Sequence, residues 1–556
     1  MKKRLKKIAI IAVLIALPGI FVFKTADNYF EISKNLQIMS SVVHEVNTYY
    51  VDEVEPSKLL RTGIDAMLKS LDPYTDFYSE SEIEDYRFMT TGQYGGVGAT
   101  ISKKGDDVMI AEPYEGWPAQ KADLRAGDIL VEVDGKSVHG KSTDDVSKLL
   151  KGSPNTELKV VIKRQGVADL ITKTITRQEI KVKDVPYYGM INEHVGYIKY
   201  TGFHQEAASQ VKAALDSLKK NNKGLDGIVF DLRGNPGGLL DEAIKTVNIF
   251  EDKGQLVVFT KGKMEEWNKQ YATESEPVDT KIPIVVLVDG GSASAAEIVS
   301  GSLQDLDRAI VVGTNSYGKG LVQTTRPLPY NTQMKVTTSK YYIPSGRCIQ
   351  KIDYARKDEE GNAYHKPDSI KQAFKTKDGR TVYDGTGIKP DVALPRKKYA
   401  DVILSLSQKQ LMFDFATEYR AKHESIPPAN KFKLSDADFN DFLAFLKDKE
   451  YTYNTQTEES LTKLEKTAKD DKYYAALEAD FKDMETKLKQ DKGEDVNKYK
   501  DDIKDILQGE IASRYYYEAG RIQASFGKDQ DVQEAVRLFN NQDEFHKILT
   551  LGNNTK

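Results

Sequence analysis

Two serines in the stretch GGSASAAEI (290–298) are the first residues of this chain whose type and setting could do chemistry. The stretch directly follows the apolar run IPIVVLVDG, which is typical of a buried strand. A strand that leads through glycine into a helix start built of small residues is where α/β folds expose reactive groups. Ser292 and Ser294 are therefore both candidate nucleophiles, although the same small residues would also suit tight helix packing.

A serine nucleophile needs a base, and a histidine is missing from this part of the chain. No histidine lies between His204 and His365, and the motifs GxSxG and HExxH do not occur. Lys319, in the glycine-rich segment GTNSYGKGLVQ (313–323), is the natural substitute, provided that it is a neutral amine at working pH. The alternative interpretation is a surface lysine on a turn.

The segment around Lys319 also matches parts of two other motifs. Gly313-x4-Gly318-Lys319 resembles a phosphate-binding loop, but Gly320 replaces the Ser or Thr that would hold magnesium, and LVQTT predicts a strand. Ser316-x-x-Lys319 matches the SxxK of penicillin-binding enzymes, which needs a helix that these glycines disfavour. A phosphate-binding loop and an SxxK motif are therefore the two alternative interpretations of this segment.

Two further glycine-rich stretches could bind anionic groups. FDLRGNPGGLL (230–240) predicts a strand, a turn and a helix, and the exposed N–H groups of such a turn suit an oxyanion. QYGGVGATI opens a β-type module over 92–180, where N–H groups could hold the carboxylate of a peptide that adds as a strand. The residues of that second site are Gly95, Gly96, Val97 and Gly98. For each stretch, the alternative is a turn without function.

The elements that must position these residues follow from the hydrophobic pattern. Strand-like and helix-like segments alternate from Val195 to about Leu394, which predicts an α/β core. Residues 27–91 show helical spacing, and residues 396–556 are helical and rich in Lys, Asp, Glu and Tyr. The sequence contains no repeat of solenoid length.

Composition sets outer limits. The chain has 556 residues, enough for about three or four domains. A net charge of −4 gives no sign of a nucleic-acid surface, and one cysteine, Cys348, permits no internal disulfide. There is no zinc-type Cys/His cluster and no calcium loop.

The N-terminus predicts export from the cytoplasm. MKKRLKK carries five basic residues, and residues 8–23 form an uncharged stretch of 16 residues, as in a signal peptide. The following KTADN offers no good cleavage site, so a cleaved signal (1–26) and an uncleaved inner-membrane anchor are both open. Either one places the rest of the chain in the periplasm.

These pieces, in this order, resemble the carboxyl-terminal processing (tail-specific) proteases, in which a PDZ domain precedes a Ser/Lys protease core. The resemblance covers about residues 35–395 and rests on DLRGNPGG, GGSASAAEI, YGKGLVQ, TTSKYYIPSGR and GIKPDV. The family's spacing of 25 residues between the two groups, counted back from Lys319, falls on Ser294 rather than Ser292. The family's glutamine, four residues beyond the lysine, falls on Gln323.

The resemblance implies a mechanism of acyl transfer without a metal or another cofactor. Ser294 would attack the peptide carbonyl, neutral Lys319 would take its proton, and Gln323 would orient the lysine. The N–H of Ala295 and of Gly237 or Gly238 would hold the oxyanion. Lys151 stands where relatives often carry an arginine thought to help sense substrate, so that role is in doubt here.

The expected architecture is a multidomain α/β chain with a mixed-sheet protease core and an inserted β-rich PDZ domain. Its segments are an N-terminal helical region (27–91), the PDZ domain (92–180), the Ser/Lys core (181–395) and a C-terminal helical extension (396–556). Expected partners are unfolded or tail-exposed protein substrates, and an adaptor or a second copy bound through the C-terminal helices. The main rival functions are a catalytically silent PDZ scaffold and a structural envelope protein.

Overall fold

The computed structural model describes residues 29–357, 361–365 and 371–550. By their contacts these form two units: the chain up to Glu80 with Gln323–Thr337, and Ser81–Val322 with the chain from Thr338 onward. The predicted export segment, residues 8–23, lies outside the described residues. Within them, no helix is both long and apolar enough to cross a bilayer.

The first unit combines a helical region with a strand ladder. Its elements are a helix over residues 29–49, α2 (Pro56–Lys69), β1 (Asp76–Tyr78) and residues 323–337 of the hairpin formed by β17 (Leu321–Leu328) and β18 (Thr332–Tyr342). β1 pairs antiparallel with Gln333–Lys335 of β18. Asp72 closes the turn before β1 by accepting from the N–H groups of Tyr74 and Thr75.

The β-rich module of the second unit follows the short helix α3 (Ile83–Thr91). β2 (Gln93–Gly96), which enters the module, pairs with β9 (Gln178–Lys181), which leaves it. Between them lies a sheet of order β3-β4-β5-β7-β8, with β6 beside β5. Its elements are β3 (Ala99–Lys104), β4 (Asp107–Pro113), α4 (Pro118–Lys121), β5 (Ile129–Val133), β6 (Lys136–Ser137), α5 (Thr143–Leu150), β7 (Glu157–Lys163) and β8 (Ile171–Thr176).

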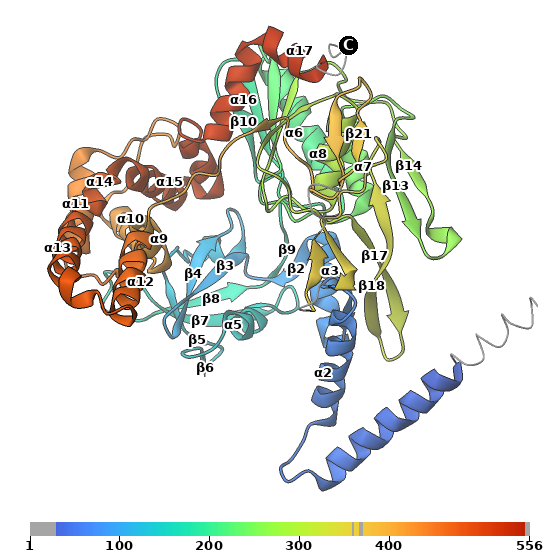
Figure 1. Ribbon diagram of the computed structural model, residues 1–556, viewed down its shortest axis with the longest axis horizontal. Helices are drawn as coiled ribbons and strands as arrows, with labels where there is room; N and C mark the ends of the chain where they lie inside the picture. Colours follow the sequence, from blue (N-terminus) through green and yellow to red (C-terminus); the bar gives the residue numbers. More distant parts are fainter. Residues whose placement is uncertain (1–28, 358–360, 366–370, 551–556) are drawn as a thin grey trace, which may run out of the picture. The chain divides into compact units, whose positions relative to one another are not determined.

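The α/β core is built on a six-stranded sheet (Figure 1). Its order is β10-β11-β12-β15-β16-β23, parallel except for the antiparallel β10. The strands are β10 (Tyr187–Met190), β11 (Val195–Lys199), β12 (Gly227–Asp231), β15 (Ile284–Val288), β16 (Ile310–Gly313) and β23 (Val392–Ala393). The central strands are apolar on both faces, as expected of a parallel sheet covered on both sides.

Helices cover the two faces of this sheet. On one face lie α6 (Ala207–Asn221), α7 (Leu240–Asn248) and α8 (Ala295–Asp305), which share a hydrophobic core with β12 and β15. On the other face lie α16 (Gln530–Asn540) and α17 (Gln542–Thr550), from the C-terminal end of the described chain. Smaller strands complete the core: β13 (Leu256–Gly262), β14 (Gln270–Ala272), β19 (Ile352–Lys357), β20 (Ala363–His365), β21 (Ala373–Lys375) and β22 (Thr381–Tyr383).

The remaining helices are α9 (Asp401–Gln408), α10 (Leu411–Lys422), α11 (Asp436–Leu446), α12 (Gln456–Asp470), α13 (Tyr474–Gly493), α14 (Asp495–Lys498) and α15 (Lys500–Ser525). All of them except α12 and α13 contribute buried side chains to a separate hydrophobic core. α15 is kinked at Tyr517, where φ is 56° and ψ is −154°.

The predicted fold class, a mixed-sheet α/β core with a β-rich insertion and helical ends, is confirmed. One feature was not predicted. The last two helices do not extend away from the core, because they cover one face of its sheet with Val532, Ala535, Leu538, Phe539 and Phe545.

Candidate active site

The two candidate serines lie in different environments. β15 ends at Val288, and the chain turns through glycine before α8 begins at Ala295. Ser292 is fully buried, and its Oγ donates to the Leu232 carbonyl (2.9 Å) and accepts from the Asp289 N–H (3.0 Å). Ser294 is partly exposed and adopts φ 55° and ψ −115°, a strained conformation for a residue other than glycine. Ser292 is therefore a structural residue, and Ser294 is the serine that solvent reaches.

The buried carboxylate of Glu297 links Ser294 to the lysine loop. Its Oε2 accepts from the N–H of Ser294 and from the N–H of Lys319, each at 2.9 Å. Its Oε1 accepts from the Ser316 hydroxyl (2.5 Å) and from the N–H of Gly318 (2.7 Å). One side chain thus holds the backbone of both candidate catalytic residues against the same oxygen atom.

A second link joins the two residues on their carbonyl side. The hydroxyl oxygen of Tyr341 lies 2.5 Å from the carbonyl oxygen of Lys319 and 3.2 Å from that of Ser294. Tyr341 is 1% exposed, and its N–H also donates to the carbonyl of Gly320. Glu297 and Tyr341 together hold Ser294 and Lys319 in a fixed relation from two sides.

Burial and hydrogen bonding act in opposite directions on the charge of Glu297. Burial raises the pKa of this carboxyl to about 7, although hydrogen bonds from Ser316, Lys319, Gly318 and Ser294 act in the opposite direction. A carboxylate can accept four hydrogen bonds, whereas a protonated acid must donate one of its own. The observed set of four donors therefore matches the ionised form.

The glycine turn after β12 lies against the serine stretch. An added Cβ on Gly237 would lie 2.8 Å from Ser294 Cβ and 2.8 Å from the Ala295 nitrogen, and its φ is +96°. Asn235 ties the turn down, because its backbone carbonyl accepts from Ala293 and its side-chain oxygen accepts from the Gly237 N–H (2.9 Å). Only glycine fits at position 237, so that the turn and the serine meet directly.

Gln323 belongs to the first unit. It lies on β17, and its side-chain amide donates to the Thr337 hydroxyl (3.2 Å) on β18. In the sequence, Gln323 lies four residues beyond Lys319.

The two other interpretations of the lysine loop fail. Residues 314–320 form a loop, and the strand β17 follows rather than a helix. The phosphate-binding interpretation needs a helix there, and the SxxK interpretation needs Ser316 and Lys319 on one. Ser316 is also buried, with its hydroxyl engaged by Glu297 and by the N–H of Ile388. Among the described residues, no group of His, Cys, Asp and Glu side chains could hold a metal ion.

The β-rich module carries a groove between β3 and α5. A cavity of about 230 Å³ is lined by Ala99 and Ile101 of β3 and by Ser147 and Leu150 of α5. Its other lining residues are Phe88, Tyr94, Val97, Tyr114 and Lys151. These side chains are mostly apolar or aromatic, as expected of a peptide-binding groove.

Of the four predicted peptide-binding residues, only Val97 lines this cavity. Gly95 and Gly96 belong to β2 and pair with β9, and an added Cβ on Gly95 would lie 2.1 Å from the Gly152 carbonyl. Gly98 has a φ of +75° and packs on Trp117. The first two glycines thus serve close backbone packing at the base of the module.

Sequence reasoning missed several residues of both sites. Glu297 follows Ser294 by three residues, and this S-x-x-E spacing is the signature of a capping box at a helix start. Phe88 lies in α3, before the module, and Lys151 at the groove pairs with Asp85 of the same helix (2.9 Å). No local pattern indicated that α3 would help to line the groove.

Three family models match this chain. Peptidase family S41 matches residues 194–357, a PDZ domain matches residues 109–164, and the C-terminal helical domain of a probable PDZ-protease matches residues 402–539. A carboxy-terminal-processing protease of Bartonella bacilliformis is 36% identical over 330 residues, which cover 59% of this chain and 75% of that protein.

Two more relatives are similar over much of the chain. A probable CtpA-like serine protease of Staphylococcus aureus is 35% identical over 367 residues, or 66% of each protein. The solved structure of the photosystem II D1 C-terminal processing protease is 28% identical and covers 64% of this chain and 93% of that one, with a TM-score of 0.35. The chain therefore belongs to the S41 peptidase family, as a carboxy-terminal-processing serine protease that carries a PDZ domain.

Proposed function

We propose that Ser294 is the nucleophile and Lys319 the general base of this peptidase, and that the PDZ groove selects substrates by a free, apolar C-terminus. The observation that supports the dyad most strongly is the shared carboxylate oxygen of Glu297, which accepts from the N–H of both residues. The difference in burial between Ser292 and Ser294 supports the choice of serine.

In the proposed reaction, the Oγ of Ser294 attacks the carbonyl carbon of the scissile peptide bond, and neutral Lys319 accepts the hydroxyl proton. When the tetrahedral intermediate collapses, the C–N bond breaks and Lys319 returns the proton to the leaving amine. Water then hydrolyses the acyl-enzyme by the same route. Gln323 is proposed to orient the lysine.

The oxyanion of the intermediate needs N–H donors near Ser294. Ala295 is the first residue of α8, so its N–H has no carbonyl four residues earlier in the helix to bind. The N–H of Gly237 already donates to Asn235, whereas the bridge to Phe203 uses the N–H of Leu239 rather than that of Gly238. We therefore propose the N–H groups of Ala295 and Gly238 as the donors, with Gly237 supplying the space.

The dyad is tested by cleavage of an unfolded protein substrate. Ser294→Ala and Lys319→Ala should each abolish cleavage, and the double variant should be no worse than either, because the two residues act as a unit. Ser292→Ala is the matched control and should stay active, since its hydroxyl binds backbone groups. Activity in Ser294→Ala, or its loss in Ser292→Ala alone, would overturn the assignment.

The tail selectivity is tested with one peptide in three forms: free acid, C-terminal amide, and with a terminal Asp added. The free acid should be cut fastest, because the PDZ domain holds a terminal carboxylate with an apolar side chain beside it. Ser147→Glu, which places a charge on the groove wall, should remove the preference, whereas Ser153→Glu in an exposed loop should keep it. Equal cleavage of all three peptides by the unchanged protein would refute this part.

We propose that the segment 8–23 directs the chain to the periplasm, as a signal or an anchor. Fractionation of cells that express the protein with and without residues 1–26 would test this.

We also propose that the helices α9–α15 bind an adaptor or a second copy of this chain. The exposed apolar side chains of Leu464, Tyr473 and Met484 on and between α12 and α13 support this. Sedimentation of the full chain before and after their replacement by Ser would show whether an assembly depends on them.

A further inference from the structure

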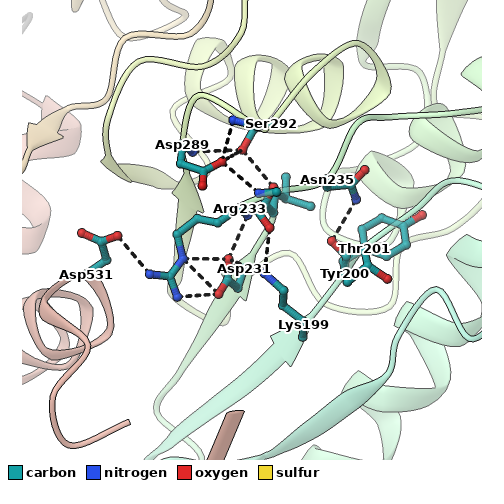
Figure 2. A network of polar contacts seen from close by, with 12 residues as sticks. Lys199, Tyr200, Thr201, Asp231, Arg233, Asn235, Asp289, Ser292 and Asp531 are labelled. Atoms are coloured by element: carbon teal, nitrogen blue, oxygen red, sulfur yellow. Dashed lines mark hydrogen bonds and ion pairs between the residues drawn. The ribbon is translucent and has the colours of Figure 1, made fainter. Parts of the chain in front are cut away.

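Arg233, in the turn DLRGNPGG, uses every donor of its guanidinium group. Its Nε and Nη2 bind the carboxylate of Asp231, its Nη1 and Nη2 bind Asp529, and its Nη1 also binds Asp531. These contacts lie between 2.6 and 3.1 Å and account for the five N–H groups that an arginine offers. Figure 2 shows Arg233 between Asp231 on one side and Asp531 on the other.

Two of these three carboxylates come from the far end of the chain. Asp529 caps the first turn of α16 by accepting from the N–H groups of Asp531 and Val532. α16 packs on the sheet face of β12, β15 and β16. Phe526, which precedes α16 in the chain, packs against Tyr197, with 4.9 Å between the two ring centroids. The hydroxyl of Tyr197 donates to Asp231 (2.6 Å), so the C-terminal segment reaches the Asp231–Arg233 pair by two routes.

The Asp231 carboxylate that binds Arg233 is buried, and its negative charge is strongly paired. Asp231 is 1% exposed, and although burial would raise its pKa, Arg233 and Lys199 hold that pKa well below its usual range. A charge-assisted bidentate pair of this kind fixes geometry as well as energy. Arg233 is thus anchored to its own strand by Asp231 and to α16 by Asp529 and Asp531.

Only a few residues separate Arg233 from the proposed catalytic centre. The Arg233 carbonyl accepts a hydrogen bond from Lys199 Nζ (2.7 Å), and the N–H of the next residue, Gly234, donates to the Asp289 carboxylate (2.8 Å). Figure 2 shows Lys199 and Asp289 on either side of Arg233. The chain then continues through Asn235 to Gly237, which lies against Ser294. A cavity of about 730 Å³ borders Arg233, so space alone would not keep its side chain in place.

We propose that Asp529 and Asp531 are positioning residues for the peptidase reaction, and that α16 holds the glycine turn in its catalytic arrangement through Arg233. This inference rests on the proposed function, in which the turn supplies an oxyanion donor. By this inference α16 contributes to catalysis by positioning the glycine turn. It packs on the protease core, although it follows the helical domain (α9–α15) in the chain.

The test is the double variant Asp529→Asn/Asp531→Asn, assayed as the full chain. Asparagine caps a helix as well as aspartate does, so α16 should keep its start while Arg233 loses two charged partners. We expect kcat to fall about 10- to 100-fold with KM unchanged, because displacement of catalytic groups by about 1 Å costs rates of that order. The matched control is Glu534→Gln/Glu544→Gln, which removes two carboxylates that pair with Arg537, one on α16 and one on α17, and should act as wild type.

A second readout separates positioning from loss of structure. A peptide boronic acid forms a tetrahedral adduct with the nucleophile, so its affinity should fall in parallel with kcat, while the Kd of a tail peptide for the PDZ groove stays constant. Asp531→Glu, which keeps the charge, should retain most of the activity lost in Asp531→Asn. If the double variant does not fold, the single variant Asp531→Asn, which leaves the cap intact, must show the lowered kcat.

The outcomes distinguish this inference from the proposed function. Wild-type kcat in the double variant, together with an inactive Ser294→Ala, would overturn the role of Asp529 and Asp531 alone. Equal losses in the double variant and in the Glu534/Glu544 control would also overturn it. An active Ser294→Ala would instead refute the proposed function.

Discussion

Replacement of Glu297 by Gln should change how the stability of the protein depends on pH. The carboxyl has a pKa of about 7 in the folded protein against an ordinary value of 4.5. Between these values the folded state binds the additional proton, so the free energy of unfolding falls as pH rises through this window. Each pKa unit is worth about 1.4 kcal/mol, so the whole decrease is about 3 kcal/mol.

The free energy of unfolding of Glu297→Gln does not decrease in this window, because an amide does not titrate. Its best orientation places the amide oxygen toward the N–H groups of Ser294 and Lys319 and the NH₂ toward the Ser316 hydroxyl, which can accept. Gly318 then keeps an unpaired, buried N–H, at a cost of about 1–3 kcal/mol. Glu297→Gln should therefore be clearly less stable than wild type at pH 5, and this deficit should shrink by about 3 kcal/mol at pH 8.

The assay is chemical denaturation of both proteins at pH 5 and pH 8, followed by tryptophan fluorescence in a Ser294→Ala background that prevents self-cleavage. Ser316→Ala is the control, because it removes one hydrogen bond to the same carboxylate but leaves the titrating group in place. Its own free energy of unfolding should still fall with pH. A deficit of Glu297→Gln that is the same at pH 5 and pH 8 would show that Glu297 does not titrate between these pH values in the folded protein.

Three further predictions concern the same site. Tyr341→Phe removes the hydroxyl that joins the carbonyls of Lys319 and Ser294. Its kcat should fall about tenfold at unchanged KM, and its free energy of unfolding should fall by about 1 kcal/mol; a wild-type kcat would contradict this. Gly237→Ala should abolish activity, because its Cβ would meet Ser294 and Ala295. Gly234→Ala, also at positive φ but with open space around it, should cost only about 1–2 kcal/mol of stability. Equal activities of the two variants would argue against the contact between Gly237 and Ser294. Activity should rise with pH, since ionised Glu297 and a neutral Lys319 are both needed, and a pH–rate profile that is flat from pH 5 to 9 would count against both roles.

Much of the α/β core could be predicted from local patterns. The strands β12, β15 and β16 are continuous apolar runs because helices cover both of their faces, and such runs are visible in the sequence. The strand after Lys319 and the helix after Ser294 were likewise predicted, and they place both residues in loops at the end of strands.

The partners of the proposed catalytic residues could not be predicted in the same way. The capping spacing of Glu297 is local, but its bonds to Gly318 and Lys319 depend on how the loop after β16 returns to α8. The role of α16 was hidden for a related reason: an amphipathic pattern shows that a helix will bury one face, without showing which surface receives it. Phe88 at the PDZ groove comes from a helix that precedes the domain, so its role depends on packing between elements.

Mass spectrometry of the trapped acyl-enzyme would show directly whether Ser294 is the nucleophile. The full chain is mixed with an activated peptide ester that ends in an apolar residue upstream of the ester, quenched in acid within the first turnover, and digested for peptide mapping. We expect the acyl mass on the peptide that contains residues 290–298, located at Ser294 by fragmentation, retained in Ser292→Ala and absent in Ser294→Ala. An acyl group on Ser292 or Ser316, or one that persists in Ser294→Ala, would rule out Ser294 as the nucleophile.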